Sequence, residues 1–67
     1  MPNIDLLKEK IKDSGIPMTV LAQKSGILRV TLYNRLSGIG DFTTSEVIGL
    51  TNALKLTKSE RDQIFLQ

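Results

Sequence analysis

Apolar residues recur at helical spacing along this whole chain, and this periodicity limits its possible folds more than any other feature. In the first segment Ile4, Leu7 and Ile11 fall on one face of a helix over residues 4–13, and the neighbouring lysines fall largely outside that stripe. No run of strict two-residue alternation is bounded by hairpin turns. The pattern therefore predicts an all-α fold.

Turn signals place the first three helices. The first ends in the turn formed by residues 14–17, where a glycine and a proline follow one another closely. The second runs from Met18 or Thr19 to Ser25 and has Leu21 and Ala22 as inward residues. The third begins near Ile27-Leu28 and ends at the two glycines within residues 37–40.

Capping signals place the last two helices. Residues 43–46 and 57–60 both have the capping-box spacing, in which a hydroxyl residue precedes a glutamate by three positions. Asp41 or Thr43 is expected to cap the fourth helix, which has an apolar stripe and is slightly weakened by Gly49. Ile64 and Phe65 are the inward residues expected in the fifth. The chain is thus predicted to form one five-helix domain over residues 1–67.

Composition excludes several classes of function. With 67 residues and neither cysteine nor histidine, the chain has no disulfide, thiolate, imidazole base or common zinc site. Tyr33 and the scattered carboxylates form no recognisable acid–base pair, and no cofactor motif is present. We therefore expect no enzyme, metal or cofactor. No apolar run is long enough to span a membrane and residues 1–5 do not resemble a signal peptide, so a soluble cytoplasmic protein is expected.

Positive charge is concentrated in the middle of the chain. The net charge is only +2, but the segment between Asp13 and Asp41 has no acidic residue and carries Lys24, Arg29 and Arg35. All seven acidic residues and the other six basic residues lie outside that segment. A distribution of this kind favours a polyanionic partner for the central segment.

The second and third helices have the residue types of two short helices crossing at a steep angle. Ala22 is small where the helices approach, and Gly26 can adopt positive φ in a tight turn. Ile27 and Leu32 are expected to fill the angle between the helices. Such a unit presents the outer face of its second helix to a groove about 12 Å wide, the width of the major groove of DNA.

Helical-wheel arithmetic sorts the third helix into two faces. Its core side is expected to hold Leu28, Leu32 and Leu36, and the opposite side and its flanks hold Arg29, Val30, Thr31, Tyr33 and Asn34. Arginine can bind guanine, asparagine can bind adenine, and valine can pack on the thymine methyl group. Any amphipathic helix also exposes mixed residues, so this face has an ordinary solvated interpretation beside the functional one.

The segment over residues 31–38, followed by Asp41-Phe42-Thr43 and the late Ile64-Phe65, resembles the lambda-repressor and Cro-like helix-turn-helix family. The similarity extends over nearly the whole chain and is to small Cro- or repressor-type proteins of phages from Gram-positive bacteria. It implies a five-helix DNA-binding domain whose third helix enters the major groove. It also implies that the N-terminus of the second helix faces the phosphate backbone.

Candidate contact residues follow from this resemblance together with the helical wheel. The candidate base contacts are Leu28, Arg29, Val30, Tyr33 and Asn34. The candidate phosphate contacts are Met18, Thr19, Lys24, Thr31, Arg35, Ser37, Gly38 and Thr43. Many family members carry an apolar residue in place of Arg35 and a polar residue in place of Leu36. Either the third helix is rotated here, or Leu36 packs in the core and Arg35 reaches a phosphate.

The expected function is sequence-specific binding of double-stranded DNA by a Cro-like repressor, in the cytoplasm or nucleoid of a bacterial host. One small domain covers a single half-site, so a homodimer on a palindromic operator is expected. Its apolar surface would come from Ile39, Phe42, Phe65 and Leu66, although core packing is the favoured role for the two phenylalanines. The alternative is a protein–protein module, such as an antirepressor or an antitoxin-like partner, that keeps the fold without specific DNA binding. No membrane or small-molecule partner is implied.

Overall fold

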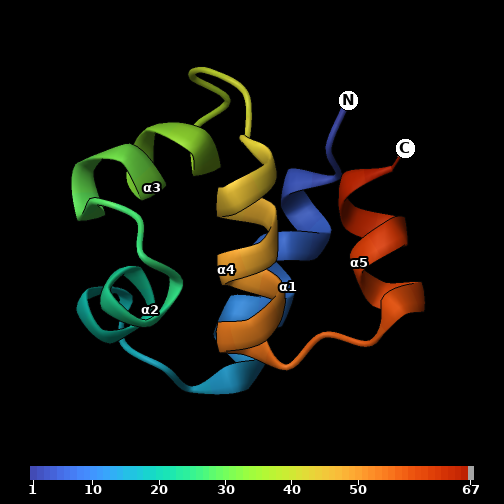
Figure 1. The fold of residues 1–67 in the computed structure, drawn as a ribbon, viewed down its shortest axis with the longest axis horizontal. Helices are drawn as coiled ribbons and strands as arrows, with labels where there is room; N and C mark the ends of the chain where they lie inside the picture. The colour runs from blue at the N-terminus through green and yellow to red at the C-terminus, as the bar shows by residue number, and fades with distance from the viewer. Residues whose placement is uncertain (67) are drawn as a thin grey trace.

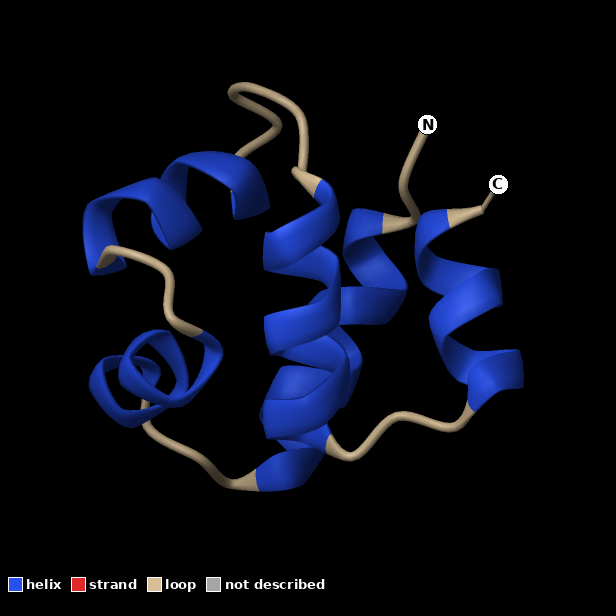
Figure 2. Ribbon diagram, viewed as in Figure 1, coloured by secondary structure: helices blue, strands red, loops and turns tan. Residues whose placement is uncertain are grey.

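The structure is a computed structural model that describes residues 1–66 and contains five α-helices and no strand in that range (Figures 1 and 2). The helices are α1 (Ile4–Ser14), α2 (Met18–Ser25), α3 (Arg29–Leu36), α4 (Thr44–Leu54) and α5 (Lys58–Phe65). The prediction of an all-α chain with five helices is confirmed. The largest shift concerns α3, which begins one or two residues later than expected.

Side chains cap the N-termini of α1, α4 and α5. The Asn3 side chain accepts a hydrogen bond from the amide of Leu6 at 3.1 Å. Both predicted capping boxes are present, with Thr43 and Thr57 as the cap residues, so Thr43 rather than Asp41 caps the fourth helix. These bonds satisfy amide groups that a helix N-terminus otherwise leaves without intrahelical partners.

α4 occupies the middle of the molecule and packs against α1 and α2 (Figure 1). α2 and α3 lie on one side of it, and α5 packs against α1 on the other. The amide of Asn3 donates to the carbonyl of Ile64 at 2.7 Å, which brings the two ends of the chain together. None of these helices combines the length and apolar character required to cross a membrane.

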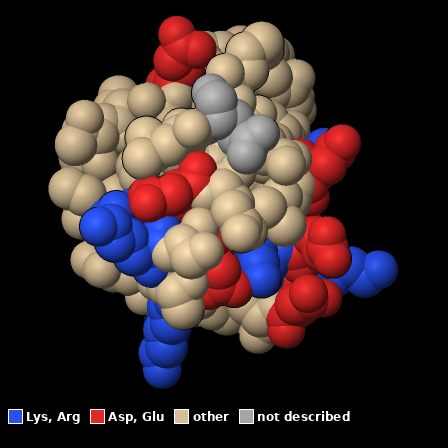
Figure 3. All heavy atoms as spheres, turned by 90° about the vertical axis from the view of Figure 1, so that its right-hand side faces the viewer, with Lys and Arg blue, Asp and Glu red and all other residues tan. Residues whose placement is uncertain are grey.

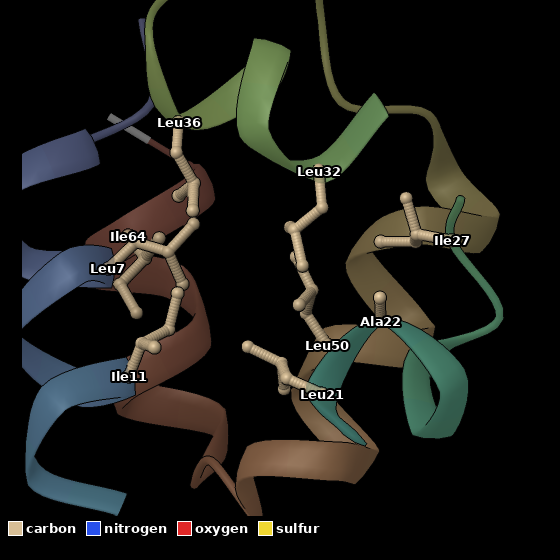
Figure 4. Packing of buried hydrophobic residues seen from close by; sticks show 9 residues of the cluster. All are labelled: Leu7, Ile11, Leu21, Ala22, Ile27, Leu32, Leu36, Leu50 and Ile64. Carbon is tan, nitrogen blue, oxygen red and sulfur yellow. The ribbon is translucent and has the colours of Figure 1, made fainter. Parts of the chain in front are cut away.

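Every helix contributes one fully buried side chain to a single core. These side chains are Leu7, Leu21, Leu32, Leu50 and Ile64. Leu32 points toward Leu21 and Leu50, so that α2, α3 and α4 meet at one place (Figure 4). Phe42 and Phe65 pack against the core and meet edge to face with their ring centroids 5.4 Å apart, which confirms the packing role favoured for them.

Candidate nucleic-acid interface

A tight turn joins α2 to α3. Gly26 ends α2 with φ at 72°, a conformation that glycine adopts without steric cost. The amide of Ile27 then donates to the carbonyl of Ala22 at 3.0 Å, and both side chains are buried. α2 is seen nearly end-on and α3 lies across the view, so their axes are steeply inclined (Figure 1). The burial predicted for Ala22, Ile27 and Leu32 is confirmed.

α3 divides into a buried and an exposed face. Leu32 and Leu36 are buried, whereas Arg29, Val30, Tyr33 and Asn34 are exposed. Val30 keeps 65% and Tyr33 keeps 49% of its surface accessible. The predicted outward orientation of these four side chains is confirmed, and their contact with bases stays a prediction.

Leu28 does not belong to the buried face, so its predicted packing in the core is wrong. It is the N-cap of α3, with ψ at 138°, and 74% of its surface is accessible. The rotation of 100° per residue used in a helical wheel holds only where the backbone is helical. Ile27 fills the core position instead, and Leu28 extends the exposed face of α3 at its N-terminal end.

Of Arg35 and Leu36, it is Leu36 that faces the core. Leu36 is buried, and Arg35 is partly buried outside the core. The Arg35 Nε donates to Glu46 Oε1 at 3.3 Å, and its Nη1 donates to the carbonyl of Ile39 at 3.2 Å. Glu46 Oε1 also accepts from the amide of Thr43 at 3.0 Å. Arg35 therefore ties the end of α3 to the loop and to the start of α4, and its phosphate contact stays a prediction.

The other candidate phosphate contacts lie on α2, on α3 and in the segment between α3 and α4. Thr19 and Lys24 are exposed on α2, and Thr31 is half-buried on α3. The hydroxyl of Thr43 accepts from the amide of Glu46 at 3.2 Å, which assigns it a capping role. The remaining candidates are the half-buried Met18, which begins α2, and the exposed Ser37 and Gly38, which follow α3.

A hollow of about 350 Å³ brings several of these residues together. It lies between α1, the start of α2 and the end of α3, and it is lined in part by Met18, Tyr33 and Ser37. Lys8 and Lys12 of α1 line the same hollow. Sequence reasoning placed these two lysines only outside the apolar stripe of α1. The sequence signal that could have found them is their spacing of four residues, which places both on one side of a helix, next to Ile11.

The N-termini of α2 and α3 differ from those of the other helices. Pro17 precedes α2 and Leu28 precedes α3, and neither provides a side-chain cap. The first amide groups of these two helices carry partial positive charge and lack the side-chain acceptor found on α1, α4 and α5. An oxygen from a bound anion can fill that place.

The two sides of the molecule differ in the charges that they carry. α2 and α3 contain no acidic residue. On the opposite side, around α5, acidic side chains lie among basic ones (Figure 3). There Lys10 of α1 binds Glu60 at 2.6 Å, and Arg61 binds the neighbouring Asp62 at 3.1 Å. Lys24 and Arg29 therefore have no carboxylate on their own helices, and Arg35 is paired with Glu46 of α4.

The exposed face of α3 supplies a guanidinium group, an amide, a phenol and apolar surface. These groups can bind a partner, and they contain no paired acid and base. Among residues 1–66, no three acidic side chains gather closely enough to hold a metal ion. Comparison with models of protein families, with curated proteins and with solved structures finds no match for this chain.

Proposed function

We propose that this chain is a sequence-specific regulator of transcription that binds duplex DNA, of the Cro-like repressor kind, in a bacterial cell. In this proposal α2 and α3 form a helix-turn-helix unit. α3 lies in the major groove with Arg29, Val30 and Asn34 at the base edges. Leu28, at the N-terminal end of α3, and Tyr33 extend this contact.

The observation that carries the proposal is the exposed face of α3. Three of its residues, Leu28, Val30 and Tyr33, expose large apolar or aromatic surfaces beside the hydrogen-bonding groups of Arg29 and Asn34. A surface of this kind suits the major groove, where each base pair presents a distinct set of donors, acceptors and methyl groups. The short turn at Gly26 and the burial of Leu32 and Leu36 hold that face outward.

The electrostatics of α2 and α3 support the same proposal. Neither helix carries an acidic side chain that would repel phosphate, and both begin with amide groups that no side chain caps. Phosphate contacts supply most of the affinity of DNA-binding proteins, and base contacts supply most of the discrimination. The proposed contacts with the phosphate backbone of DNA are Met18 and Thr19 at the start of α2, and Ser37 and Gly38 after α3.

Selection of bound fragments from random duplex DNA tests the proposal directly. The bound pool is expected to contain a palindrome whose half-sites lie one helical turn apart. Binding should weaken steeply as salt is added, because phosphate contacts release counterions. Absence of salt-dependent duplex binding would favour the protein–protein module instead.

Substitutions on α3 test which residues read the sequence. Arg29→Ala and Asn34→Ala are each expected to reduce discrimination at one base position by about 1–3 kcal/mol, measured by competition with duplexes changed at that position. Asn52→Ala is the matched control, because Asn52 is an exposed asparagine on α4. If Arg29→Ala and Asn34→Ala both kept the wild-type preference, as Asn52→Ala should, this face of α3 would not be the reading surface.

A further inference from the structure

Three helices contribute to the hollow beside the recognition surface. Lys8 and Lys12 of α1 share it with Met18 of α2 and with Tyr33 and Ser37 at the end of α3. Three of these residues belong to the candidate DNA contacts. The two lysines therefore lie at the edge of the same surface, although α1 is remote from α3 in the sequence.

The lysines of α1 have different surroundings. Lys10 is held by Glu60 of α5. Lys8 and Lys12 lie one helical turn apart on the side of α1 that meets the hollow, and both are exposed. Within residues 1–66, neither of them forms an ion pair, and no carboxylate lines the hollow.

Two adjacent ammonium groups at this place fit the chemistry of the DNA backbone. The major groove is about 12 Å wide and is bordered by phosphates on both sides. A helix of about 10 Å diameter that fills the groove therefore brings residues at its edge close to the sugar–phosphate chain. Tyr33 of α3 and Ser37, which follows α3, line the same hollow as Lys8 and Lys12. A phosphate beside these two residues is therefore also near the two lysines.

We propose that Lys8 and Lys12 bind phosphodiester groups of DNA at the border of the groove that α3 occupies, which makes α1 a third DNA-contacting helix. This inference rests on the proposed function. Each lysine acts as a mobile point charge with no sequence preference. The pair therefore raises the affinity for every duplex by a similar factor.

The experiment measures the salt dependence of duplex binding by fluorescence anisotropy. The double variant Lys8→Gln with Lys12→Gln is expected to reduce the slope of log affinity against log salt by about 1.8, since each phosphate contact contributes about 0.9. The affinity ratio of wild type to variant should then shrink by about tenfold between 50 and 200 mM salt. The loss should be similar on the selected operator and on an unrelated duplex.

Two further variants serve as controls. Lys55→Gln with Lys58→Gln removes the same charge from exposed residues at the α4–α5 connection and should keep the wild-type slope. Lys8→Arg with Lys12→Arg keeps the charge and should also keep the slope. Thermal unfolding by circular dichroism checks that all variants fold. Lys8→Gln alone and Lys12→Gln alone should each reduce the slope by about 0.9.

The outcomes separate this inference from the proposed function. If the wild type binds DNA and Arg29→Ala alters its sequence preference, but the two double Lys→Gln variants behave alike, the contact from α1 is refuted and the proposed function stands. If the wild type binds no duplex at low salt, the proposed function fails and this inference fails with it.

Discussion

Gly49 shows how a single residue can have a role that helix propensity does not indicate. Glycine weakens a helix, and the sequence gives no other reason for its presence within α4. In the structure α4 passes the end of α2 at this point, and a Cβ on Gly49 would clash with the carbonyl of Ser25. The close contact between the two helices requires a residue without a side chain there. Only the packing of distant segments could reveal this requirement.

Gly49→Ala is therefore expected to destabilise the fold, although alanine is the better helix former. The clash is with main-chain atoms, which cannot move aside as a flexible side chain can. We expect a net loss of about 1–2 kcal/mol in the free energy of unfolding, measured by urea denaturation. Asn52→Ala, at an exposed position of the same helix, should leave stability unchanged or raise it slightly. A higher urea midpoint for Gly49→Ala would contradict this account.

Two other residues mark the limit of prediction from the α3 sequence. The wheel assigned Leu32 and Leu36 correctly, because their backbone is helical, and it failed for Leu28 one residue before the helix. The role of Arg35 depends on Glu46, which lies 11 residues later and also caps α4. Local periodicity carries no information about that pairing.

At the scale of helices, local sequence signals predict those features whose stabilising contacts are also local in the sequence. The caps of α4 and α5 lie within four residues and were predicted from spacing alone. The tie between α1 and α5 was not predicted, because Lys10 and Glu60 lie 50 residues apart. The hydrogen bond from Lys10, followed by bonds from the amide and hydroxyl of Thr57, lowers the pKa of Glu60 from 4.5 to about 2.

This lowered pKa predicts an acid-sensitive contact between α1 and α5. The contribution of Glu60 to stability is fully present above pH 4.5, where the carboxyl is ionised in both the folded and the unfolded chain. It decreases as the pH falls from 4.5 toward 2, because the unfolded chain takes up the proton first. Bonding to Glu60 also raises the pKa of Lys10, so the complementary loss occurs above pH 10.5.

Glu60→Gln tests this contact without removing the cap. Glutamine can still accept the amide hydrogen bond of Thr57 in a capping box, but it carries no charge. The variant is expected to melt at a lower temperature than the wild type at pH 7, and the difference should diminish between pH 4.5 and pH 2. Melting is followed by circular dichroism. A difference that stayed constant over this range would show that the charge on Glu60 is unimportant.

At the scale of the whole molecule, the proposed function together with the size of the chain predicts two copies on DNA. The Cα trace measures 26 × 23 × 19 Å. Its longest dimension is shorter than the distance of about 34 Å that separates successive faces of the major groove. The apolar patch expected for dimerisation is smaller than the sequence suggests, because Phe42 and Phe65 are half-buried and contact each other. The apolar surface that stays open includes Ile48 of α4 and Leu66 after α5, at 55% and 73% exposure.

These two side chains border a hollow of about 380 Å³ between α4 and α5, lined also by Val47 and Phe65. We expect this surface to contact a second copy when two half-sites are occupied, because a two-fold pair buries the same patch on both copies. Ile48→Glu should then lower the affinity for a two-half-site duplex by about tenfold or more. Binding to a single half-site and thermal stability should stay unchanged, since Ile48 is largely exposed.

Gln63→Glu is the matched control for Ile48→Glu, because it adds the same charge to an exposed residue of α5 that does not line this hollow. It should bind both duplexes as the wild type does. The measurement is anisotropy with duplexes carrying one or two half-sites, together with sedimentation of the complexes. Since the two copies must meet for the second half-site to add affinity, an Ile48→Glu variant that kept the wild-type preference for the longer duplex would place the dimer contact elsewhere on the molecule.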